Sequence, residues 1–99
     1  MNESRWEQLA DILVNYSTAT VSGDRVLITM METDTWPLAR AVHAAAVQAG
    51  AHPHIEFQST LLQRDLMRGG DPEQFDNSHE LQEKGMRWAD VYIGLRGAS

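Results

Sequence analysis

Two histidines and a glutamate alternate over residues 52–56, and side chains of these types could bind a metal ion. His52, His54 and Glu56 are spaced by two, so on a β-strand all three lie on the same face. Imidazole and carboxylate groups are common ligands of transition metals. Neighbouring side chains on one face of a strand stand about 6.5–7 Å apart, however, which is too far for all three to reach one ion easily. We therefore predict a solvated face of an edge strand, with the alternate residues Pro53, Ile55 and Phe57 packing inward.

Trp36 and Arg96 are the best-placed residues for a substrate cleft. In open α/β sheets, ligands bind in the crevice beyond the carboxyl ends of the strands. Trp36 follows the first expected strand, and Arg96 stands at the carboxyl end of the last one. The alternatives are burial in the core for the tryptophan and a structural ion pair for the arginine. We expect no catalytic residue within this chain.

The sequence lacks the residues that several common types of reaction need. Cysteine is absent, which excludes thiol catalysis, disulfides and Cys-ligated zinc. Residues 30–37 contain no glycine, so the first strand is not followed by a phosphate-binding loop, and Glu32 and Asp34 would repel a nucleotide. His43 is interpreted as a surface residue, and His79, with two nearby glutamates, as part of a polar helix. No Ser-His-Asp arrangement can be assembled.

The charge balance excludes two classes of partner. The chain has 99 residues with 8 basic and 14 acidic side chains, giving a formal net charge of −6. Nucleic acids and anionic membranes attract clustered basic residues, so we expect neither as a partner. The polar N-terminus resembles no signal peptide, and the apolar runs are much shorter than the ~20 residues that span a bilayer. A cytoplasmic location follows as the expectation.

Hydrophobic patterning predicts three strands separated by helices. A Ser4–Glu7 capping box opens a first helix that ends near residue 17, with large apolar residues at helical spacing. Its predicted buried stripe is Trp6, Leu9, Ile12, Leu13 and Tyr16. Apolar strands are expected at residues 25–30, 52–57 and 91–95. An alanine-rich helix with Pro37 in its first turn lies between the first two strands. A short helix over residues 61–67, a helical turn opening at residues 71–72 and a helix from Ser78 lie between the last two.

Strands alternating with helices imply parallel pairing through right-handed crossovers. We predict an α/β fold: half of a three-layer parallel-sheet structure with a Rossmann-like βαβ order. The last strand is expected to be central, yet the sequence given stops at Ser99 directly after it. The fold is therefore expected to be incomplete, and residues 1–99 to be one domain of a two-domain protein.

Four segments together resemble a known family. They are residues 23–28 (GDRVLI), 37–41 (PLARA), 49–53 (AGAHP) and 88–96 (WADVYIGLR). Their order and spacing are similar to the N-terminal α/β domain of the thermophilic metallo-aminopeptidases of the aminopeptidase T type, over nearly the whole chain. The resemblance implies a longer, homo-oligomeric parent protein acting on peptides. It also implies a C-terminal domain, absent here, with a centre of two divalent metal ions (zinc, cobalt or magnesium). The ligands would be carboxylates, histidines and a tyrosine beyond Ser99.

Three hypotheses follow for function. The first is the N-terminal domain of a metal-dependent aminopeptidase, which walls and gates the active-site cavity and is inactive alone. The second is a stand-alone, non-catalytic binding module that uses Trp36 and the strand ends. The third is the corresponding domain of a related non-haem iron dioxygenase that cleaves hydroxypyridine rings. Under the first, we expect Val91, Ile93 and Leu95 to leave apolar surface open, so that the isolated chain self-associates.

Overall fold

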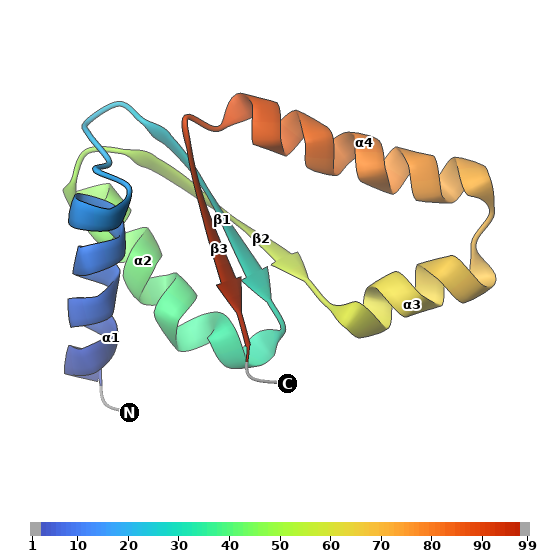
Figure 1. Ribbon diagram of the computed structural model, residues 1–99, viewed down its shortest axis with the longest axis horizontal. Coiled ribbons are helices and arrows are strands. Elements are labelled where there is room, and N and C mark those ends of the chain that lie inside the picture. The colour runs from blue at the N-terminus through green and yellow to red at the C-terminus, as the bar shows by residue number, and fades with distance from the viewer. Residues whose placement is uncertain (1–2, 98–99) are drawn as a thin grey trace.

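The computed structural model describes residues 3–97 as a parallel sheet with helices on both sides (Figure 1). The elements follow in the order α1 (Glu3–Asp11), a π-helical segment (Ile12–Ser17), β1 (Arg25–Met31), a 3-10 turn (Thr33–Thr35), α2 (Trp36–Gln48), β2 (His52–Gln58), α3 (Thr60–Gly69), α4 (Pro72–Trp88) and β3 (Val91–Arg96). The α/β class and the parallel sheet agree with the sequence prediction. None of the helices among the described residues is long and apolar enough to cross a membrane.

The sheet has the strand order β2-β1-β3 within residues 3–97, and both pairings are parallel. Ile28 of β1 lies between Ile55 of β2 and Ile93 of β3, which places β1 at the centre. The prediction of a central last strand is therefore wrong for this part of the chain, because β3 pairs only with β1. The prediction that residues 52–57 form an edge strand is confirmed.

The core lies between the sheet and α2, and α1 packs on α2. Alternate residues of β1 face this layer, where Val26 and Ile28 are completely buried against alanines of α2. Small side chains allow the helix backbone to approach the sheet closely. Ile93 and Leu95 of β3 point into the same layer and are buried, and Val91 packs against it. The expectation that these three residues would remain open is therefore wrong.

The face that the N-terminal helix turns to the core only partly matches the predicted one, since Leu13 of the predicted stripe packs against the core. It begins at Glu3, so Ser4 lies inside the helix and does not cap it. Ala10 and Val14 are buried, whereas Leu9, Ile12 and Tyr16 are exposed. Small residues fit against the alanines of α2, and the wider turn of the π-helical segment changes the phase of the side chains.

The segment between β2 and β3 forms two helices. Ser59 caps α3, accepting a hydrogen bond from the N–H of Leu61. Asp71 and Gln74 form a capping box at the start of α4, which then runs unbroken through Ser78 to Trp88. The predicted division into a short turn and a later helix is wrong, because this strong cap and the absence of a breaker favour one continuous helix.

Candidate functional site

The carboxyl ends of the three strands meet at one edge of the sheet. Met31 at the end of β1 is paired with Gln58 of β2 and with Arg96 of β3. The loop after β1 and the start of α3 lie at this edge. Ligands of open parallel sheets bind at such an edge, so its side chains are the first candidates for a functional site.

Glu32 ties the end of β1 to the start of α3. Its carboxylate accepts hydrogen bonds from the backbone N–H of Thr60 at 2.7 Å, the Thr60 hydroxyl at 3.1 Å and the Ser59 hydroxyl at 3.2 Å. The hydrogen bond from the backbone N–H of Thr60 favours the charged carboxylate and so lowers the pKa of Glu32 below its usual value. The hydrogen bonds from the two hydroxyls act in the same direction. A carboxylate held in this way is suited to fixing the edge of the sheet and poorly suited to accepting a proton.

The backbone at Glu32 is strained. Its φ of 68° and ψ of 159° belong to a region that glycine normally occupies. Its N–H donates to the carbonyl of Gln58, and its own carbonyl accepts from the hydroxyl of Thr35. These bonds offset the strain and hold the loop in one conformation. From the sequence alone, Glu32 is predicted only to repel nucleotides. The signal for its structural role is an acidic residue after one strand and a Ser-Thr pair after the neighbouring strand.

Asp34 and Arg96 bring opposite charges to the same edge. The Asp34 carboxylate lies so close to Gly97 that any side chain at position 97 would overlap it. Arg96 is exposed at the end of β3. The edge therefore has an exposed guanidinium next to an acidic loop.

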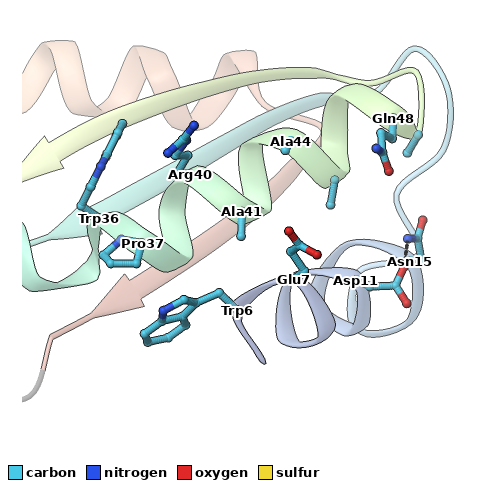
Figure 2. Close-up of a pocket in the computed structure, with 12 residues that line it drawn as sticks. Trp6, Glu7, Asp11, Asn15, Trp36, Pro37, Arg40, Ala41, Ala44 and Gln48 are labelled. Atoms are coloured by element: carbon cyan, nitrogen blue, oxygen red, sulfur yellow. Dashed lines mark hydrogen bonds between the residues drawn. The ribbon is translucent and has the colours of Figure 1, made fainter. Parts of the chain in front are cut away.

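Trp36 lies beside a groove between two helices. It begins α2, is 49% exposed, and lines a groove of about 850 Å³ between α1 and α2. Figure 2 shows Trp6 at the end of this groove near Pro37, while Trp36 extends away from α1. Arg96 is not among the residues that line the groove. That Trp36 and Arg96 serve a substrate cleft stays a prediction.

The α1–α2 groove has polar walls and an alanine floor. Glu7 projects from α1 toward α2, where Ala41 and Ala44 form the floor, and Asp11 extends toward Asn15 (Figure 2). Asp11 accepts a hydrogen bond of 2.6 Å from the Asn15 side-chain amide. The side chains that line the groove offer acidic, amide and apolar contacts and the guanidinium of Arg40, and they include no nucleophile.

The alternating residues of β2 do not form a metal centre. His52 and His54 are exposed, and the ring of His54 meets the edge of Trp88 with centroids 6.5 Å apart. Glu56 lines a separate cavity of about 270 Å³ beneath α3 and α4. Within residues 3–97, no group of three or more His, Asp or Glu side chains is arranged to hold a metal ion. Phe57 is 45% exposed, so the prediction that it packs inward is wrong.

The remaining histidines lie on helix surfaces. His79 of α4 is 3.2 Å from Glu83, one helical turn away, and both side chains are largely exposed. His43 is exposed on α2. Both positions agree with the interpretation of these residues as solvated.

Comparison with known protein families identifies the family of this chain. The sequence pattern of one family, described as thermophilic metalloprotease (M29), matches residues 2–96 of the chain. The chain belongs to this family. Its members are metallopeptidases, so a divalent metal ion is implied for the parent enzyme. No curated protein matches the chain closely.

The metal implied by the thermophilic metalloprotease family does not fit the residues described here. A catalytic centre needs several converging His or carboxylate ligands. At the sheet edge, the carboxylate of Glu32 is already occupied by three donors, and Asp34 lies against Gly97. The described residues therefore supply no set of ligands for this metal.

Proposed function

We propose that this chain is the N-terminal α/β domain of a metal-dependent aminopeptidase that removes N-terminal amino acids from peptides by two-metal hydrolysis. The observation that carries the proposal is the family match over residues 2–96. The metal ligands would lie in a further domain, and the 99-residue chain would be inactive alone. We place the enzyme in the cytoplasm.

In this proposal the chain supplies a wall of the active-site cavity. The carboxyl edge of the sheet is kept rigid by the bonds of Glu32 to α3. Arg96 is exposed there and would hold a carbonyl or carboxylate oxygen of the peptide. Trp36 would contribute apolar surface at the rim of the neighbouring groove. Both residues act by positioning substrate, because neither can serve as a nucleophile or a general base.

The test begins with the length of the encoded reading frame and the mass of the full protein. The full protein is then assayed on leucine amide, with the N-acetylated amide as the control because it lacks a free amino group. We expect release of leucine from the unblocked substrate only, loss of activity with a chelator, and recovery with zinc or cobalt. The 1–99 chain should be inactive in the same assay.

Two results would overturn the proposal. Hydrolysis of leucine amide by the 1–99 chain with a stoichiometric metal ion would show that the reactive centre is here. Copurification of iron, with oxygen-dependent cleavage of a hydroxypyridine and no peptidase activity, would assign the chain to the related dioxygenases instead.

A further inference from the structure

The cavity of about 270 Å³ lies between β2 and the two helices that follow it. Residues 56–59 at the end of β2 form one wall, and side chains of α3 and α4 form the others. Figure 1 shows α3 leaving the end of β2 and α4 running back toward the start of β3, on the side away from α1. Sites for drug-sized ligands measure about 300–1,000 Å³, so this cavity has room for a molecule about the size of one amino-acid residue.

Glu56 brings a carboxylate to this cavity and has no partner for it. Alternation along β2 turns Glu56 to the opposite face of the sheet from Ile55, which packs against the core. Its neighbour in register on β1 is Thr29, whose hydroxyl lies 2.8 Å from the hydroxyl of Tyr92. Glu56 is half-buried and forms no hydrogen bond or ion pair with any residue in 3–97. A charge drawn from water without a partner costs free energy, so a cation is favoured beside this carboxylate.

The rest of the cavity lining is neutral. The side chains of Gln63, Ser78 and Gln82 form no hydrogen bond within the described chain and can bond polar atoms of a ligand. Three leucines supply apolar contacts: Leu62, Leu66 and Leu81. None of the described Lys, Arg or His residues lines the cavity. This set of groups suits a ligand with one positive charge, an aliphatic group and no negative charge.

From these observations we propose that the cavity binds a small aliphatic primary amine, such as the amino end of a peptide that begins with leucine. The ammonium group donates hydrogen bonds to the carboxylate of Glu56, and the aliphatic group contacts the leucines of the hairpin. The amides of Gln63 and Gln82 bond the carbonyl of the ligand. A free amino acid fits less well, because its carboxylate meets no cation in the lining. The inference concerns binding by this chain and does not depend on the proposed peptidase reaction.

Amide NMR shifts of the 99-residue chain test the class of ligand on the wild type. At pH 7 the amino group of leucine amide is protonated. Leucine amide should shift residues 56–59 and 78–82 with a Kd of about 1–10 mM, the range for a ligand of about nine non-hydrogen atoms. Three control ligands should each bind at least about tenfold more weakly. They are N-acetylleucine amide, which lacks the charge, free leucine, which adds a carboxylate, and glycine amide, which lacks the aliphatic group.

Two results of this titration would overturn the proposal. One is binding of any control ligand as tightly as leucine amide. The other is the lack of a saturable shift with leucine amide at about 100 mM, ten times the upper end of the expected range, with ionic strength held constant.

Glu56→Gln tests the role of the carboxylate. The substitution keeps the size of the side chain and removes the charge, so leucine amide should bind at least about tenfold more weakly. Glu73→Gln is the matched control, because Glu73 is an exposed glutamate of α4 that does not line the cavity, and its Kd should equal that of the wild type. Equal Kd values for the two variants would contradict the proposal.

Ser78→Phe tests the place of binding without changing the charge. The larger side chain fills the space between α4 and β2, so leucine amide should no longer bind, whereas Ser78→Ala leaves the cavity open and should retain binding. Unchanged binding by Ser78→Phe would place the ligand elsewhere and refute the proposal. Circular dichroism checks that each variant is folded, and the ligand series on the wild type holds the test if one is not. Release of leucine in these samples would count against the proposed inactivity of the chain, whereas missing shifts would count against this site.

Discussion

Replacing Ile28 by alanine tests whether the core is the buried layer of the structure or includes the stripe of large apolar residues predicted for the N-terminal helix. Ile28 is completely buried at the centre of the sheet, between Ile55 and Ile93. The substitution removes three carbon atoms, worth about 0.8 kcal/mol each, and leaves a cavity that adds further cost. We expect a loss of about 3 kcal/mol in the free energy of unfolding. That corresponds to a fall of about 12–24 °C in the melting temperature of a domain of this size.

Ile12→Ala is the matched control for this prediction. It deletes the same atoms from the π-helical segment, where the side chain is 49% exposed. The expected loss is about 1 kcal/mol or less, because about half of the side chain is already in water. Urea denaturation followed by circular dichroism gives both values on one scale. Equal losses in the two variants would refute the assignment of the buried face, since they would place Ile12 in the core with Ile28.

Two further substitutions probe packing and charge. Ala46→Leu, at a completely buried position of α2, should lower the free energy of unfolding by about 1–3 kcal/mol, because the added atoms separate the helix from the sheet. Ala44→Leu, at an exposed position, should change this free energy little. Urea denaturation measures both variants, and equal effects would contradict the close packing. Glu32→Gln should lower stability at pH 7. Because folding lowers the pKa of Glu32, its contribution is present above the unfolded pKa and is lost as the pH falls through the folded one, so the two proteins should converge in acid. A difference that persists at low pH would show that charge is not the cause.

The strands and α2 could be predicted from sequence because their signals are local. The apolar run of β1 is bounded by a turn at Gly23. Pro37 lies in the first turn of α2, and Gly50 follows that helix with a φ of 80°, where a Cβ would lie 2.7 Å from Ser22 Oγ. Pro37 restricts its own backbone and the two glycines permit the positive φ that their turns require, so no knowledge of the partner strand is needed.

The buried face of α1 and the bonds of Glu32 could not be predicted in this way. Ala10 and Val14 were overlooked because a large apolar residue gives a stronger signal than a small one, although the small one fits against the alanines of α2. The role of Glu32 depends on the register of β1 and β2, which brings Ser59 and Thr60 beside it. Register is a property of the paired strands, and neither segment specifies it alone.

The two sides of the sheet contribute unequally to the free energy of unfolding. The largest fully buried side chains all lie in the layer formed by the sheet, α1 and α2, and Ile28, Val26 and Val42 are among them. On the other side, α4 approaches the sheet where Gly85 lies over Leu27, and the hairpin formed by α3 and α4 has no buried residue in the described chain. Substitutions in the first layer should therefore unfold the chain, whereas substitutions at exposed positions of this hairpin should leave the fold intact. A hairpin variant that unfolds as readily as Ile28→Ala would show that the hairpin belongs to the core.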